Sequence, residues 1–216
     1  EVKARQVLDS KGRPVAEVDI ITDDGHLGRA GASTGSSVGA NESFVMRDGD
    51  PNLFGGLSVF KAIDNVKRVI APAIIGMSVH DQEGIDRRMV ELDGTRYKTN
   101  LGGNAIYATS VAVARASASA SSKPIYLNMA RKPIKYIYTP TSNVVNGGVY
   151  NGKTMAFQEF MVMPCNVDSV NDAVRIIVEV FNHLGNVIKA YTKETPPAGN
   201  YSGWGAPSDD PFEVMD

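Results

Sequence analysis

An amide and a carboxylate stand side by side in an apolar part of this sequence. Gln158 and Glu159 lie within residues 155–164, where most other side chains are aromatic or aliphatic. Burying a carboxylate there costs free energy unless the group is paired, so a strand that retains one is a candidate functional site. The alternative is that Glu159 simply faces water, because side chains alternate between the two faces of a strand.

Small residues form a second candidate site. Residues 31–41 are almost all Gly, Ala, Ser, Thr or Asn and cannot pack a core. Such a stretch is either a flexible linker or a mobile loop that brings backbone groups close to a ligand or a metal ion. Composition alone leaves both interpretations open.

Charge and composition exclude several classes of protein. The chain has 216 residues, 43% of them hydrophobic, with 22 basic and 24 acidic residues spread along it. This balance gives no reason to expect nucleic acid or an anionic membrane as a partner. The single cysteine, Cys165, fits a reducing compartment, and no apolar run reaches the roughly 20 residues of a membrane span.

The first part of the chain predicts a hairpin followed by helices. Residues 15–22 alternate as a strand, residues 23–25 supply turn chemistry, and residues 26–30 return as a second strand. Helical spacing begins at Val59 and is predicted to stop at Pro72. Two further helices are expected: one from about Asp81 that buries Ile85 and Met89, and a small-residue helix over 104–119 that allows close packing.

The pattern changes near residue 135, where we place a domain boundary. Strands are predicted at 138–145 and 157–163, and a long amphipathic helix at 170–188, capped by Ser169 or Asp168. The expected domains are residues 1–135, a mixed sheet-and-helix domain, and residues 136–216, the beginning of a layered α/β domain.

Many segments of the chain, taken together, resemble the enolase family. They are ARQVLDSKGRP (4–14), GASTG (31–35), MRDGD (46–50), IAPAIIGM (70–77), DQ (81–82), ELDGT (91–95), LGGNAI (101–106), NVVNGG (143–148) and QEFM (158–161). The resemblance implies an α/β fold: an enolase-like α+β N-terminal capping domain followed by the first part of a (β/α) barrel. The barrel of the family extends beyond the part that matches this chain. The family's two active-site lysines and its three carboxylate metal ligands are therefore expected beyond Asp216.

The resemblance also implies an activity. Enolases are cytoplasmic, usually homodimeric lyases of glycolysis that reversibly dehydrate 2-phosphoglycerate to phosphoenolpyruvate with Mg²⁺. By position, Ser33 matches the family's serine ligand of the second Mg²⁺. Gln158 and Glu159 match a Gln-Glu pair near the substrate, where the glutamate takes part in the departure of the hydroxyl group.

Other positions depart from the family pattern. Tyr150 stands in place of a substrate-binding histidine, and Ser202 in place of the general-acid glutamate. A serine hydroxyl does not readily supply a proton near neutral pH. Residues 36–41 make the following connection about four residues longer than usual, and Lys11 and Arg13 replace an arginine and an asparagine in a segment that reaches the family's dimer interface.

Three interpretations follow from these observations. The first is an enolase-family lyase. The second is a catalytically impaired enolase paralogue with a structural or interaction role, which the changes at Tyr150 and Ser202 favour. A dehydratase of acids or sugars from the wider superfamily is the third, and the GASTG segment, which resembles enolase itself, argues against it.

Overall fold

A computed structural model describes residues 1–35, 38–199 and 202–216. The chain divides into two compact units, residues 1–133 and residues 134–216.

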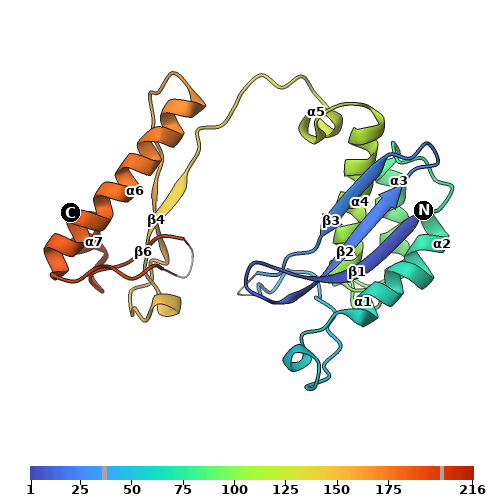
Figure 1. The fold of residues 1–216 in the computed structure, drawn as a ribbon, viewed down its shortest axis with the longest axis horizontal. Helices are drawn as coiled ribbons and strands as arrows, with labels where there is room; N and C mark the ends of the chain where they lie inside the picture. The colour runs from blue at the N-terminus through green and yellow to red at the C-terminus, as the bar shows by residue number, and fades with distance from the viewer. Residues whose placement is uncertain (36–37, 200–201) are drawn as a thin grey trace. The chain divides into compact units, whose positions relative to one another are not determined.

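The first unit is built on a three-stranded antiparallel sheet (Figure 1). Its strands are β1 (Val2–Leu8), β2 (Pro14–Ile21) and β3 (Leu27–Gly31), in the order β1-β2-β3. Pairing of Ile21 with Leu27 and of Glu17 with Gly31 confirms the predicted hairpin. The sequence pattern missed β1, because Gln6 interrupts the apolar alternation; its Oε1 accepts a hydrogen bond from the N–H of Val59 at 3.0 Å instead.

The helical stretch after Val59 runs past Pro72, so the predicted end was wrong. It consists of α1 (Phe60–Asn65), a π-helical turn (Val66–Ile70) and α2 (Ala71–Ile74). The N–H of Ala71 donates to the carbonyl of Val66, five residues back, so the helix is widened just before the proline. The proline then occupies the first turn of α2, where its missing N–H and its ring are tolerated.

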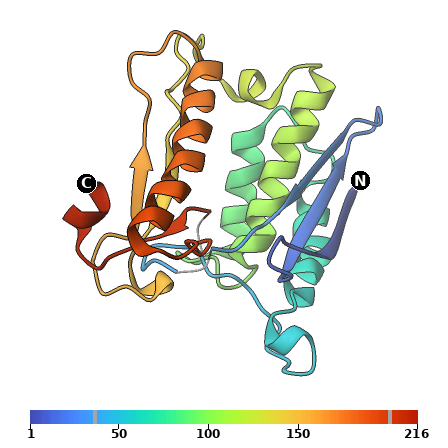
Figure 2. The same cartoon turned by 60° about the vertical axis from the view of Figure 1, so that its left-hand side comes forward.

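The next two helices agree with the prediction. The helix α3 (Gln82–Asp93) buries Ile85 and Met89, and the Asp81 side chain caps it by accepting from the N–H of Gly84. The helix α4 (Gly103–Ala120) lies along one face of the sheet (Figures 1 and 2). Its alanines allow the close approach that the sequence predicted. The described part of this unit also contains a 3₁₀ turn (Phe54–Gly56) and the short helix α5 (Ile125–Met129).

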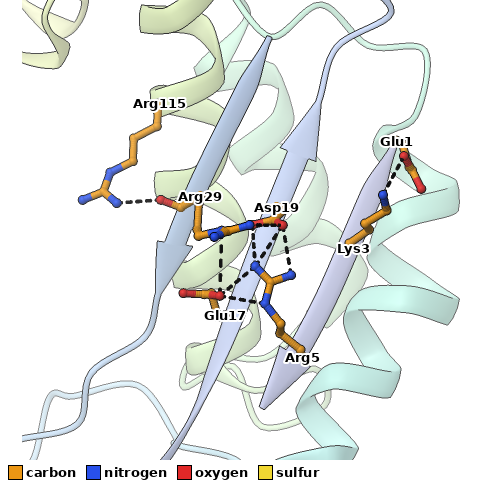
Figure 3. Close-up of polar contacts among 7 residues, drawn as sticks. All are labelled: Glu1, Lys3, Arg5, Glu17, Asp19, Arg29 and Arg115. Carbon is orange, nitrogen blue, oxygen red and sulfur yellow. Dashed lines mark hydrogen bonds and ion pairs between the residues drawn. The ribbon is translucent and has the colours of Figure 1, made fainter. Parts of the chain in front are cut away.

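The sheet separates an apolar face from a charged one. Toward α4 it presents Ala4, Ala16, Val18, Ile20 and Ala30, all at most 6% exposed. The opposite face carries Arg5, Glu17, Asp19 and Arg29, which form an ion-pair network (Figure 3). Asp19 is only 4% exposed because two arginines cover it.

The second unit has a small mixed sheet covered by one long helix. Its strands are β4 (Ser142–Asn146), β5 (Glu159–Val162) and β6 (Trp204–Gly205), in the order β5-β4-β6; β5 is antiparallel and β6 parallel to β4. The helices are α6 (Val170–Thr192), the terminal α7 (Pro211–Met215) and a 3₁₀ turn (Val149–Asn151). The strand predicted from residue 138 begins only at Ser142, since Pro140 cannot donate to a ladder.

The helix α6 closes the core of this unit. Ser169, one of the two predicted caps, accepts a hydrogen bond from the N–H of Asp172 and starts the helix. Trp204 stacks on Phe181 with ring centroids 5.0 Å apart, and its indole N–H donates to the carbonyl of Phe181 at 2.9 Å. These contacts fix β6 against α6. Across the residues that the structure describes, no helix has the length and apolarity to cross a membrane.

Candidate functional site

Ser33 lies in the first unit, two residues beyond the end of β3. The N–H of Ala32 still donates to the carbonyl of Ala16 at 2.9 Å, and Ser33 follows with an exposed side chain. The next two residues are held by arginines: Arg13 donates to the carbonyls of Thr34 and Gly35, and Arg47 to the Thr34 hydroxyl. The Ser33 hydroxyl is therefore accessible, and the two residues that follow it, Thr34 and Gly35, are held by hydrogen bonds from arginine side chains.

Glu159 is the first residue of β5 and has an exposed side chain. Along this strand Phe160 and Val162 pack against the core that α6 covers, and Glu159 alternates with them. Since neighbouring residues of a strand point to opposite faces, Glu159 lies on the face away from α6. The carboxylate therefore belongs to the open face of the sheet, not to the packed one.

A buried amide, Asn146, stands directly beside Glu159. Asn146 at the end of β4 pairs with Glu159 on one side and with Gly205 on the other, and it is 0% exposed. Its side chain fills the space between two glycines: a Cβ added at Gly199 would lie 2.4 Å from its Oδ1, and one at Gly203 2.6 Å from its Nδ2. Asn146 therefore sets how closely the loop before β6 approaches β4.

The glycine-rich turn after β4 folds back on the strand that carries Gln158. The N–H of Gly147 donates to the carbonyl of Gln158 at 2.9 Å. A Cβ added at Gly147 would lie 2.4 Å from the carbonyl oxygen of Phe157, so only glycine fits there. The exposed Gln158 side chain is thus next to the turn Val149–Asn151. That turn carries Tyr150, whose side chain lies outside the described part of the chain.

An aspartate that the sequence did not single out anchors the far end of this loop. Asp209 accepts a hydrogen bond from the N–H of Thr154 at 2.6 Å, and this bond lowers the pKa of its carboxyl group. The carboxylate thus ties residues 146–154 to the segment after β6. No local signal could have found it, because 55 residues separate the two partners.

Ser202 is exposed and has a backbone φ of 68°, a left-handed conformation that is unusual for serine. It immediately precedes Gly203, which packs on Asn146. The predicted residues of the second unit thus gather around one strand end: Glu159 pairs with Asn146, Gln158 contacts the turn after it, and Ser202 lies in the loop that packs on it. Ser33 belongs to the other unit.

The described residues do not make a metal site on their own. Within residues 1–35, 38–199 and 202–216 there is no group of three or more histidine, cysteine, aspartate or glutamate side chains that could hold a metal ion. A hard divalent cation takes six or more oxygen ligands, usually with carboxylates among them, and Ser33 offers a single neutral hydroxyl. The residues present therefore do not fit a complete Mg²⁺ site.

Family models match almost the whole chain. A model described as the N-terminal domain of enolase matches residues 1–129, and one described as the C-terminal TIM barrel domain of enolase matches residues 135–213. The order of the two matches, together with the mixed helix and strand content of both units, confirms the predicted fold class. The strands described in the second unit do not close into a barrel.

Proposed function

Because the chain belongs to the enolase family, we propose that the protein to which these residues belong is a lyase that reversibly dehydrates 2-phosphoglycerate to phosphoenolpyruvate. The observation that carries the proposal is the placement of Glu159 at the start of β5, on the face away from α6 and paired with the buried Asn146. In a barrel, the face opposite the covering helices is the interior, where substrates are bound at the strand ends.

Glu159 is the group that we assign to the hydroxyl that leaves C3. Its place at a strand end, with a rigid amide beside it, allows a carboxylate to be held within hydrogen-bonding distance of a bound substrate. Gln158 lies next to the Gly147–Gly148 turn and is assigned to substrate contact. Tyr150 on the same turn is assigned the same role, with a phenol in place of an imidazole.

Mg²⁺ would supply positive charge that stabilises a developing enediolate, and Ser33 is the residue of this chain assigned to it. The described residues do not form a complete site for this ion. The carboxylate of Glu159 and the amide of Gln158, both in the second unit, are the groups of this chain that we assign to the substrate.

The alternative function is that of an impaired paralogue with a structural or interaction role. The observation that favours it is Ser202, a hydroxyl held in a left-handed backbone conformation at the position of the family's general acid. Replacing a carboxylic acid by an alcohol removes general acid catalysis, which typically contributes 10²–10⁴-fold to the rate.

The test is the assay of the complete protein with 2-phosphoglycerate and Mg²⁺, followed by the ultraviolet absorbance of phosphoenolpyruvate. Turnover that is abolished by chelation and strongly reduced in Glu159→Gln supports the lyase. Absence of turnover in a folded protein supports the paralogue. We also propose that the complete protein is a cytoplasmic homodimer, which sedimentation of the purified protein and fractionation of the cell would test.

A further inference from the structure

The loop that carries Ser33 is fastened by an arginine from the turn between β1 and β2. Arg13 donates from Nη2 to the carbonyl of Thr34 at 2.5 Å and from Nη1 to the carbonyl of Gly35 at 3.2 Å. These are the two carbonyls that directly follow Ser33 in the chain. The guanidinium therefore holds the backbone beside Ser33 and leaves the serine hydroxyl accessible.

Asp9 holds this arginine in place. The Nε of Arg13 donates to Asp9 Oδ2 at 2.8 Å, and the N–H groups of Lys11 and Arg13 donate to Asp9 Oδ1 at 2.8 and 2.9 Å. The side chain of Asp9 is 10% exposed and that of Arg13 26% exposed. One carboxylate thus shapes the turn and aims the guanidinium. The planar guanidinium group of arginine can bind the carboxylate and the loop carbonyls together, because its N–H groups point in several fixed directions.

A second arginine restrains the same residue from the side. Arg47 donates from Nη2 to the hydroxyl of Thr34 at 3.0 Å, and its Nη1 bonds the carbonyls of Pro14 and Leu57 at 2.5 and 2.6 Å. Thr34 is therefore held at its carbonyl by Arg13 and at its hydroxyl by Arg47. The two contacts come from different parts of the first unit, so together they restrict both rotation and translation of the loop.

We propose that Arg13 is a positioning residue for Ser33: by binding the carbonyls of Thr34 and Gly35, it holds the serine hydroxyl in one place before a ligand binds. That Ser33 contacts a ligand rests on the proposed function, whereas the restraint on the loop does not. The loop is therefore preorganised. Part of the conformational entropy that would otherwise be lost on ligand binding has already been lost when the protein folds.

The experiment compares Arg13→Asn and Arg13→Lys with the wild type in the complete protein. Asparagine, the residue expected here from the family resemblance, is too short to reach both the aspartate and the loop. Lysine keeps a cation beside Asp9, but its single ammonium does not reproduce the fork. The matched control is Arg115→Asn, which removes an arginine that donates to a backbone carbonyl, that of Arg29 at 2.5 Å, elsewhere in the same unit.

Two readouts separate positioning from general stability. Amide NMR order parameters of Thr34 and Gly35 are expected to fall from about 0.85 toward 0.6 in Arg13→Asn and to stay unchanged in Arg115→Asn. The KM for 2-phosphoglycerate is expected to rise about fivefold to tenfold in Arg13→Asn, the net effect of losing one ordinary hydrogen bond, with kcat within about twofold. Arg13→Lys should lie between wild type and Arg13→Asn in both readouts.

The proposal is overturned if Arg13→Asn leaves the order parameters of both residues at their wild-type values, or if Arg115→Asn lowers them equally. If Arg13→Asn does not fold, Arg13→Lys decides by the same criterion. A protein with no lyase activity refutes the proposed function, while the NMR comparison still tests the restraint. If Arg13→Asn lowers the order parameters of Thr34 and Gly35 but leaves the KM unchanged in an active protein, Arg13 restrains the loop without positioning Ser33 for a ligand.

Discussion

Gly28 in β3 lies against the carbonyl group of Ala112 in α4, so closely that a Cβ added at Gly28 would be 2.0 Å from that oxygen and 2.2 Å from the nitrogen of Ala116. Both neighbours are backbone atoms, which cannot move without displacing the helix. We expect Gly28→Ala to destabilise the first unit by at least about 2 kcal/mol, the cost of overpacking a core. Urea unfolding followed by circular dichroism measures it.

Gly31 in the same strand is the matched control. A Cβ there would meet only the carbonyl oxygen of Ala16, at 3.9 Å, which is ordinary contact. Gly31→Ala should therefore change the free energy of unfolding by no more than about 0.5 kcal/mol. If the two substitutions lowered the free energy of unfolding equally, the cause would be the loss of a glycine from the strand and not a clash with α4.

Asp19 predicts a specific dependence of stability on pH. Its carboxylate receives hydrogen bonds from Arg29 and Arg5 at 2.7–2.9 Å (Figure 3). The hydrogen bond from Arg29 lowers the pKa of Asp19 most, and the bonds from Arg5 lower it further. Burial acts in the opposite direction but is the smaller effect, so the pKa of Asp19 lies below its ordinary value. The folded pKa is thus below the unfolded value of about 3.9, so the stabilisation is fully present above that value and is lost as the pH falls through the folded pKa.

Asp19→Asn should destabilise the protein by about 1–3 kcal/mol at pH 7, because Arg5 and Arg29 lose the more buried of the two carboxylates that they share. The difference from wild type should shrink as the pH is lowered below 4, since the wild-type carboxyl group then becomes neutral too. Thermal unfolding from pH 2 to pH 7 measures both. Glu179→Gln, which breaks an exposed pair with Arg175 on α6, is the control and should leave the unfolding temperature nearly unchanged.

Glu159→Gln tests the assigned carboxylate. The side chain is exposed, so the substitution should leave the unfolding midpoint nearly unchanged. If Glu159 assists departure of the hydroxyl group, kcat should fall by about 10²–10⁴-fold. Steady-state kinetics of the complete protein, with Glu179→Gln as the matched change on α6, provide the comparison. A kcat within a few-fold of wild type would remove Glu159 from the chemistry.

Local patterns predicted those elements whose signals lie close together in the sequence. The helix α6 has an unbroken apolar stripe and a capping serine at its start, and the β2–β3 hairpin has alternating strands around a turn. The strand β1 was missed because polar Gln6 interrupts the apolar alternation; its side chain makes a tertiary hydrogen bond with the N–H of Val59. Pro72 was misread because the π-helical turn before it, a feature without a sequence signature, makes room for the ring.

The candidate site was less predictable, because its arrangement depends on distant residues. Asn146 gives no local signal, and its role emerges only when Gly199 and Gly203 pack around it. The resemblance selected Ser33, Gln158, Glu159, Tyr150 and Ser202. In the structure, the segments that carry Gln158, Glu159, Tyr150 and Ser202 lie around the end of β4 in the second unit. The roles of these residues remain predictions.

Tyr150→His combined with Ser202→Glu tests whether the two departures from the family pattern limit activity. If the roles assigned from the family resemblance hold, the double substitution should raise kcat/KM for 2-phosphoglycerate by at least about tenfold, because it supplies an imidazole and a carboxylic acid that can transfer a proton. Ser202 is exposed, so a longer side chain meets no packed neighbour, and the left-handed backbone strain is the same for both residues.

Ser202→Gly is the informative companion variant. Glycine relieves the left-handed strain at φ 68°, so it should stabilise the fold by about 1 kcal/mol without supplying an acid. A gain in activity for the double variant but not for Ser202→Gly would assign the effect to proton transfer and not to a more stable loop. Equal activity in the wild type and in the double variant, with both folded, would mean that these two side chains do not limit the activity.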